Sequence, residues 1–254
     1  MSPKLLIAFP FLLLSFQSQS QVVSKLDTIT ETKVIPFSNI CQQQITRKKF
    51  LGKKSTFLST GFLIRPNIIL TAGHNVYSNS LSKVVKIKVY PGKNNDNTAY
   101  DAIEIKGESL CQLAIRVHPS YNFTKNDRIK WDFAVIIIPD SIIQRISNWP
   151  SSSAFSFDIN HRLKENDSIF VAGFPASGGY SGEIMTYQSG LSGQLSTNKF
   201  THGFDTHTGN SGSPVWIEKD MKRIVVGVHT FAGAATLLEE NNLNYVLQWL
   251  SLHL

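Results

Sequence analysis

Residues 208–216 read TGNSGSPVW, a stretch that places Ser211 between Gly209 and Gly212. Glycine adopts backbone conformations that other residues avoid, so the chain can turn sharply on either side of the serine. Such a turn is expected to present one hydroxyl together with nearby backbone N–H groups. What that hydroxyl can do depends on the other side chains that folding brings to it.

A serine hydroxyl is a poor nucleophile at neutral pH and needs a base to take its proton. His74 is the best candidate base, because ILTAGHNVY (69–77) places it just after a predicted strand, at a turn of small residues. A histidine base in turn needs a carboxylate that fixes its tautomer. Asp132, in KWDFAVIIIP (130–139), is a lone acid beside a predicted buried strand, where an unpaired charge is costly. We therefore expect Asp132 to pair with His74.

Each of these residues alone has an ordinary explanation: a turn serine, a packed histidine and a capping aspartate. Their joint occurrence in the order His74, Asp132, Ser211 favours a catalytic set instead.

The composition indicates a globular chain of moderate positive charge. It has 254 residues, 42% of them hydrophobic, which is enough for one large domain or two small joined ones. The formal net charge is +7, but basic clusters such as Arg47–Lys49 are short and lack interleaved aromatic residues. A solvated loop face is therefore expected there, with no nucleic-acid partner.

The first twenty residues, MSPKLLIAFPFLLLSFQSQS, have the pattern of an export signal. A lysine precedes an apolar run at 5–14, and small residues precede Gln21. The run is too short to span a bilayer. We predict a signal peptide at 1–20, a possible pro-segment at 21–33, and a secreted, extracellular product without a membrane anchor. In an oxidising compartment the two cysteines, Cys41 and Cys111, are expected to form one disulfide worth about 2–4 kcal/mol, with free thiols as the alternative.

The rest of the chain predicts many short strands. Segments rich in β-branched and aromatic residues are bounded by Gly, Pro, Asn and Asp. KVVKIKVY (83–90) alternates, as in a half-exposed strand, while FAVIII (133–138) is continuous, as in a buried one. One helix is predicted near the C-terminus, with Leu243, Val246, Leu247 and Leu250 on one face. This pattern favours an all-β protein of roughly two barrels closed by an end helix.

TAGH, WDFAVI and GNSGSPV together resemble the motifs of trypsin-like serine peptidases, most closely the branch of the V8-like glutamyl endopeptidases. VAGFP (171–175) and VVGVHTFAG (225–233) are similar to strands of that branch, so the resemblance runs from about residue 34 to the end. It implies a peptidase domain at 34–254 built of two six-stranded antiparallel β-barrels (chymotrypsin-like) at about 34–145 and 155–240, with a C-terminal α-helix.

The resemblance also implies roles for these residues. Ser211 would attack a peptide carbonyl, His74 would move the proton and Asp132 would orient His74. The N–H groups of Gly209 and Ser211 would form the oxyanion hole. Protein or peptide substrates, a monomeric enzyme and no cofactor are expected.

Cleavage specificity has two competing predictions. Thr206 and His229 match the residues that contact the substrate carboxylate in glutamyl endopeptidases, which favours cleavage after Glu or Asp. Asp205 lies six residues before Ser211, at the spacing of the trypsin acid that receives Lys or Arg. The first alternative is preferred, and the second stays open.

The chain departs from the digestive enzymes at two positions. Asn210 replaces the aspartate that pairs with a newly cut N-terminus, and Asn75 replaces a cysteine that staples the histidine loop, so packing is expected to hold that loop. Cleavage after Lys33 would still leave Val34 as a new N-terminus. Outside this enzyme class, a non-catalytic binding module on the same fold is the main alternative. The absence of an HExxH motif or a close Cys/His cluster predicts no metal.

Overall fold

The computed structural model describes residues 24–95, 97–122, 127–231, 233–252 and 254, so the predicted signal peptide at 1–20 lies outside the described residues. Short strands dominate the described chain, as its β-branched and aromatic segments predict. The strands are β1 (Asp27–Ile29), β2 (Ile40–Lys49), β3 (Lys54–Arg65), β4 (Ile68–Thr71), β5 (Ser82–Pro91), β6 (Lys93–Asn94), β7 (Asn97–Thr98), β8 (Ile103–Lys106), β9 (Ile115–Val117), β10 (Ala134–Ile137), β11 (Phe155–Ser156), β12 (Ser168–Gly173), β13 (Met185–Ser196), β14 (Lys199–His202), β15 (Pro214–Lys219), β16 (Lys222–Phe231) and β17 (Ala234–Leu237).

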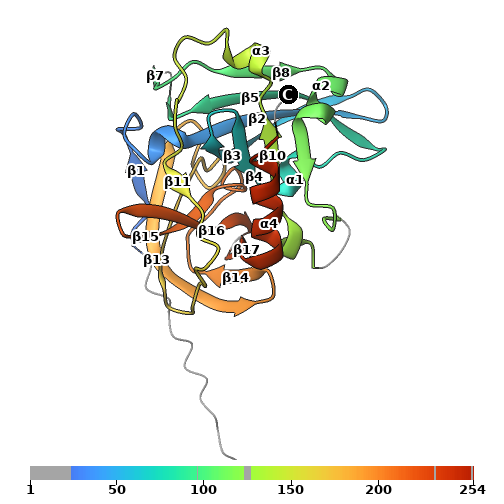
Figure 1. Ribbon diagram of the computed structural model, residues 1–254. Helices are drawn as coiled ribbons and strands as arrows, with labels where there is room; N and C mark the ends of the chain where they lie inside the picture. The colour runs from blue at the N-terminus through green and yellow to red at the C-terminus, as the bar shows by residue number, and fades with distance from the viewer. Residues whose placement is uncertain (1–23, 96, 123–126, 232, 253) are drawn as a thin grey trace, which may run out of the picture.

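Two large, mainly antiparallel sheets form most of the described chain, one in the upper and one in the lower part of Figure 1, and β6 and β7 form a separate two-stranded sheet. The first has the order β8-β5-β2-β3-β4-β10-β9 and curls into a half-barrel. The second has eight strands. Six of them, in the order β13-β12-β15-β16-β17-β14, close into a barrel because β14 also pairs with β13, while β1 adds to β13 and β11 pairs in parallel with β16. The predicted all-β, chymotrypsin-like class is thus confirmed. The barrel closure of the lower sheet is complete, whereas the upper sheet has seven strands and is open between β8 and β9.

Burial explains the two strand patterns. All four residues of β10 are buried, as the continuous apolar run FAVIII predicts. The C-terminal part of β5 alternates between buried and partly exposed residues, because only one of its faces meets the core. Each sheet encloses an apolar cluster of its own. A third cluster joins the two sheets and includes Phe62, Phe133, Phe174 and Trp216. This shared core fixes the two sheets against each other, and with them the loops at their junction.

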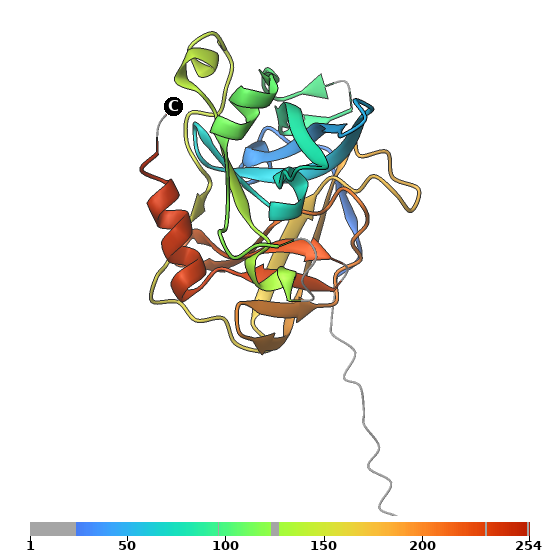
Figure 2. The same cartoon turned by 90° about the vertical axis from the view of Figure 1, so that its right-hand side faces the viewer.

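Helices occupy the margins of the two sheets. They are α1 (Gly73–Val76), α2 (Glu108–Ala114), α3 (Asp140–Ile143) and α4 (Glu240–Trp249), with 3₁₀ turns η1 (Phe37–Asn39) and η2 (Arg128–Trp131). The predicted terminal helix is α4, which runs along one side of the molecule in Figure 2. Its Leu243, Val246 and Trp249 are buried, whereas Leu247 is 36% exposed, so the apolar face is narrower than predicted. No helix within the described ranges is long and apolar enough to cross a membrane.

The expected disulfide is not formed. Cys41 and Cys111 are free and fully buried in the apolar cluster of the first sheet. Cys41 lies on β2 and Cys111 on α2, and each Sγ faces a backbone carbonyl at 3.6 Å, of Asn39 and Ile105 respectively. The expectation was wrong because both thiols serve as small apolar side chains of the core.

The described part of the predicted pro-segment is built into the fold. β1 pairs with β13, with Asp27 opposite Tyr187 and Ile29 opposite Met185. Further along, the buried Thr32 hydroxyl donates to the Gly92 carbonyl at 2.6 Å. Residues 27–32 therefore contact the barrel and the turn that follows β5, and a cut after Lys33 would separate this strand covalently from the rest of the chain.

Candidate active site

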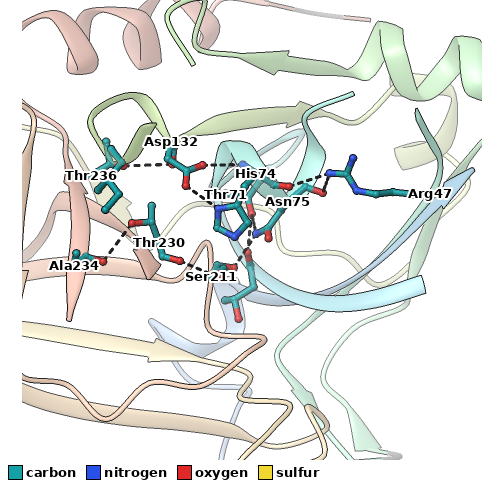
Figure 3. Close-up of polar contacts among 11 residues, drawn as sticks. Arg47, Thr71, His74, Asn75, Asp132, Ser211, Thr230, Ala234 and Thr236 are labelled. Carbon is teal, nitrogen blue, oxygen red and sulfur yellow. Dashed lines mark hydrogen bonds and ion pairs between the residues drawn. The ribbon is translucent and has the colours of Figure 1, made fainter. Parts of the chain in front are cut away.

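His74 and Asp132 meet where the first sheet faces the barrel (Figure 3). His74 lies on α1, directly after β4, and Asp132 lies between η2 and β10. The carboxylate accepts two hydrogen bonds from the same residue: the His74 backbone N–H donates to Oδ1 and ring Nδ1 donates to Oδ2, both at 2.7 Å. The Asp132 side chain is fully buried, and that of His74 is 18% exposed. The pairing that the sequence predicts is present, and it fixes both the position and the tautomer of the ring.

Small and polar neighbours permit this close approach. A Cβ atom at Gly73 would lie 3.1 Å from Asp132 Oδ1 and 3.2 Å from the Phe133 backbone nitrogen, so a side chain there would push the acid away. The turn that carries Asp132 is held from the other side by β17, because the Thr236 hydroxyl donates to the Ile129 carbonyl at 2.5 Å. The acid is therefore positioned by both sheets.

Ser211 lies in the loop between β14 and β15, which belongs to the barrel. The flanking glycines have φ values of +101° at Gly209 and +93° at Gly212, in the region that favours glycine. A Cβ at Gly212 would collide with the Thr60 carbonyl of the first sheet, and one at Gly209 with the Phe174 carbonyl. The two glycines thus serve a tight turn that packs against neighbouring backbone, as TGNSGSPVW (208–216) predicts.

The Ser211 hydroxyl does not donate to His74 in this structure. Its Oγ donates instead to the Thr230 carbonyl at 3.0 Å. The next residue, Phe231, stacks on the His74 ring at a centroid distance of 5.4 Å, so the hydroxyl lies within the same small group of residues as the imidazole. Serine hydroxyls rotate freely, and catalytic hydrogen bonds often tighten only when substrate is bound.

Two backbone N–H groups beside Ser211 are unused. The N–H groups of Asn210, Gly212 and Ser213 donate to the carbonyls of His207, His229 and Asn210. Those of Gly209 and Ser211 donate to no group among the residues that the structure describes. An unpaired pair of N–H groups beside a nucleophile is what an oxyanion hole requires.

Sequence reasoning missed the group that holds the histidine loop. The Asn75 amide, next to His74, donates to the Ser211 carbonyl at 2.8 Å and to the Thr71 hydroxyl at 3.1 Å. The Arg47 guanidinium on β2 donates to the carbonyls of His74, Asn75 and Tyr77 at 2.9, 3.0 and 2.5 Å. The loop is therefore held by directed hydrogen bonds in addition to packing (Figure 3). The replacement of cysteine by Asn75 was the available signal, but the contact with Ser211 depends on the packing of the two sheets.

We expect Asn75→Ala to slow the reaction of Ser211 with a fluorophosphonate probe by about tenfold, because the loss of a buried hydrogen bond costs about 1–3 kcal/mol. Asn75 joins the histidine loop to the nucleophile, so its removal should loosen the alignment of the two. The labelling rate and the thermal unfolding midpoint would be measured together.

Gln42→Ala is the matched control. Gln42 is a fully buried amide that also bridges distant segments, since it donates to the Gly182 carbonyl at 2.7 Å. Its loss should lower stability and leave the labelling rate of the folded protein near that of the wild type. Equal labelling rates for the two variants would show that Asn75 has no special role.

A pocket of about 450 Å³ adjoins Ser211. It brings together two of the three predicted specificity residues, Thr206 and His229. Thr206 Oγ1 is buried and has no hydrogen-bond partner among the described residues. The pocket is lined by Ser177, Thr206, His207, Thr208, Ser211, His229, Thr230 and Phe231.

His229 is buried and paired with a second histidine. Its Nδ1 lies 3.1 Å from Nε2 of His202, and Nδ1 of His202 accepts the Phe204 backbone N–H at 3.3 Å. Burial, and then the positive charges that His202 and His74 would carry, hold the pKa of His229 well below its ordinary value. Burial lowers the pKa of His202 to about 4. Both rings are therefore uncharged at neutral pH.

Asp205 is not among the residues that line this pocket. Its side chain is 65% exposed, and its carboxylate lies 3.4 Å from Nε2 of His207. The neutral Asn210 stabilises the turn before Ser211 by accepting the His207 N–H at 3.2 Å through Oδ1. The structure thus separates Asp205 from the pair formed by Thr206 and His229.

Comparison with known proteins defines the family. Residues 38–241 match the trypsin family, so the chain belongs to this family of serine endopeptidases. A solved structure of a Glu endopeptidase in complex with MPD is similar, with a TM-score of 0.64 and 25% identity over 88% of this chain and 95% of that one. This likeness places the chain near the glutamyl endopeptidase branch.

Two further proteins are similar to this chain. The protease Anisep from Arthrobacter nicotinovorans is 14% identical, with a TM-score of 0.58 over 80% of this chain and 91% of that one. The curated "Extracellular metalloprotease" of Bacillus subtilis (strain 168) is 24% identical over 208 residues, which are 82% of this chain and 60% of that protein. The match therefore spans less than two thirds of that relative. Within the described ranges, no group of three or more His, Cys, Asp or Glu residues is placed to hold a metal ion.

Proposed function

We propose that the protein is a secreted serine endopeptidase that cleaves peptide bonds after Glu or Asp by way of an acyl-enzyme. Family membership supports the reaction, and the hydrogen-bonded pair of His74 and Asp132 beside Ser211 supports its mechanism. The predicted export signal supports secretion. The acidic preference depends on one observation: the pocket beside Ser211 contains a buried, unpaired threonine hydroxyl and a buried histidine.

In the proposed reaction, Ser211 Oγ attacks the substrate carbonyl carbon while Nε2 of His74 takes its proton. Asp132 stabilises the resulting imidazolium through the 2.7 Å contact with Nδ1. The carbonyl oxygen becomes an oxyanion, which the N–H groups of Gly209 and Ser211 stabilise. His74 then gives its proton to the leaving amine, and water releases the acyl group by the same steps.

The hydrogen bonds around His229 support a carboxylate as the ligand of the pocket. The Phe204 N–H makes Nδ1 of His202 an acceptor, which assigns the His202 proton to Nε2. That N–H then donates to Nδ1 of His229, which leaves the His229 proton on its own Nε2. A neutral ring with an N–H, together with the Thr206 hydroxyl, provides two donors for a substrate carboxylate.

The test is a set of peptides that differ only in the residue before the scissile bond. We expect kcat/KM to be about 10–100-fold higher for Glu than for the isosteric, neutral Gln, because a hydrogen bond to a charged group is worth about 1.5–3 kcal/mol. Peptides with Lys or Arg at this position should be cleaved poorly, since the pocket lining includes no carboxylate.

Two substitutions separate the alternatives. Thr206→Val keeps the side-chain shape, removes the hydroxyl and should lower the preference for Glu over Gln. Asp205→Asn should leave that preference unchanged, because its carboxylate is 65% exposed and does not line the pocket. Cleavage restricted to Lys or Arg, and lost in Asp205→Asn, would overturn the acidic preference and favour the trypsin-like alternative.

A further inference from the structure

The hairpin between β2 and β3 has an uncovered apolar tip. Phe50 is 78% exposed and Leu51 is 91% exposed. Leu81, from the neighbouring loop before β5, is 67% exposed and lies beside them, because the Phe50 N–H donates to the Leu81 carbonyl at 2.9 Å. Three large apolar side chains therefore point into solvent at one place. Burial of apolar surface is the main driving force of association, so such a tip indicates a surface that becomes covered.

Lysines surround this tip. Four lie in the hairpin itself, and others follow on the adjoining strands of the first sheet. Strand register places Lys48 directly opposite both Lys54 on β3 and Lys83 on β5, and Lys86 opposite Lys106 on β8. Like charges at directly opposite positions destabilise a sheet. We call this set the lysine face; it consists of Lys48, Lys49, Lys53, Lys54, Lys83, Lys86 and Lys106.

Little negative charge offsets the lysine face. Glu108 pairs with Lys83 at 2.8 Å, and it is the only carboxylate within salt-bridge distance of these seven lysines among the described residues. The arrangement thus keeps unfavourable cross-strand charge pairs whose repulsion an external anion would relieve.

The lysine face is also hollowed. A cavity of about 390 Å³ is lined by Lys48, Lys54, Lys86 and Lys106, and a second, of about 240 Å³, by Lys48, Lys49, Lys83 and Phe50. The two share Lys48 and Glu108, so they adjoin. The second cavity also connects the ammonium groups with the apolar tip. The surface therefore has recesses for several anionic groups beside an apolar projection.

We propose that this hairpin docks the protein on the surface of an anionic lipid membrane. Phe50, Leu51 and Leu81 would enter the boundary between headgroups and acyl chains, while the lysine face binds the phosphate groups of the lipids. Interfacial binding combines these two features, an apolar insertion and a basic surround. A soluble polyanion would meet the lysines alone and leave the apolar tip in water.

The lysine face and the hollow beside His74 lie on opposite faces of β2. Arg47 and Lys48 are consecutive on this strand, and successive side chains of a strand point to opposite faces. Arg47 lines a hollow of about 320 Å³ with Phe57 and His74, whereas Lys48 lines the two cavities of the lysine face. Docking through the lysine face would therefore leave the hollow beside His74 uncovered.

The test is co-sedimentation of the full mature chain with vesicles of phosphatidylcholine alone, or with 30% phosphatidylglycerol. We expect at least tenfold stronger partitioning to the anionic vesicles, and weaker binding as NaCl is raised. The variant Phe50→Ser/Leu51→Ser/Leu81→Ser and the variant Lys48→Gln/Lys54→Gln/Lys86→Gln should each lower partitioning by at least tenfold.

A second hairpin offers the matched control. Met221 is fully exposed in the turn Asp220–Met221 between β15 and β16, and Lys219 and Lys222 lie on either side of this turn. Met221→Ser/Lys219→Gln/Lys222→Gln should partition like the wild type. All variants change exposed or partly exposed residues. Unfolding midpoints no lower than that of the wild type, together with hydrolysis of a soluble peptide, would show that they fold; the lysine variant should even unfold at a slightly higher temperature, because it loses like-charge pairs.

Binding to dextran sulfate as tight as to anionic vesicles, and unaffected by the apolar substitutions, would overturn the proposal in favour of a soluble polyanion. Equal partitioning to neutral and anionic vesicles would also overturn it. Loss of vesicle binding with peptide hydrolysis intact would support the docking surface and leave the proposed function untouched.

Discussion

Ser211→Ala is expected to lower kcat on the preferred peptide by about 10⁶, to the level left by binding and the oxyanion hole. Removal of the hydroxyl removes the acyl-enzyme, and no other residue in the pocket replaces it. Because the three residues act as a unit, adding His74→Ala should lower kcat little further. The measurement is single-turnover hydrolysis at high enzyme concentration, for the single and the double variant.

Loss of the Ser211 hydroxyl should disturb the fold very little, since within the described ranges this hydroxyl hydrogen-bonds only to the Thr230 carbonyl. Unfolding midpoints of wild type and Ser211→Ala should therefore agree closely. A fluorophosphonate probe should label the wild type and not the variant. If the wild type were not labelled, or if Ser211→Ala hydrolysed peptide as fast as the wild type, the non-catalytic alternative would gain support.

Much of the arrangement around Ser211 could be predicted because each of the three candidate catalytic residues lies in a short sequence motif. TAGH ends a strand, WDFAVI begins one, and the glycines beside Ser211 need positive φ values that the structure has. Short motifs of this kind predict which residues lie at the ends of strands. The resemblance to a family then supplied the spatial order, because nothing local shows that residues 58 positions apart meet at 2.7 Å.

Contacts that depend on how the two sheets pack could not be predicted. Asn75 contacts the Ser211 carbonyl across 136 residues of chain, and Arg47 meets the histidine loop because β2 lies two strands from β4. The orientation of the Ser211 hydroxyl towards the Thr230 carbonyl could not be predicted from the sequence either. The disulfide between Cys41 and Cys111 was wrongly expected for a related reason. An oxidising compartment and the presence of two cysteines do not determine where the two side chains lie inside a core.

Exposure of the β2–β3 tip is a further example. From the sequence, Arg47–Lys49 and Lys53–Lys54 indicate a solvated basic loop, and the structure agrees that these lysines are at the surface. Only the strand register shows that Lys48 faces two other lysines, and only burial shows that Phe50 and Leu51 are uncovered. The tip of the β2–β3 hairpin thus combines basic and apolar surface, whereas the sequence pattern indicated only a basic loop.

Asp132→Asn is expected to lower kcat by about 10⁴ while the fold stays intact. The carboxylate accepts the His74 backbone N–H at Oδ1 and the ring N–H at Oδ2. Asparagine has one acceptor oxygen, which the backbone N–H would take. Its NH₂ group would then face Nδ1 and force that nitrogen to become an acceptor. The ring proton would move to Nε2, the nitrogen that must take the proton from Ser211.

This experiment separates two contributions of residue 132 to catalysis: control of the His74 tautomer, and the presence of any hydrogen bond to the ring. Asparagine fills the same space, and both contacts to His74 can still form, so stability should change far less than catalysis. Thr236→Val provides the comparison, because Thr236 holds the turn of Asp132 without touching the ring. It should lower the unfolding midpoint and reduce kcat by less than about tenfold. A loss of less than tenfold in Asp132→Asn would mean that a hydrogen bond of either polarity suffices, and Asp132 would then be a structural partner of His74 only.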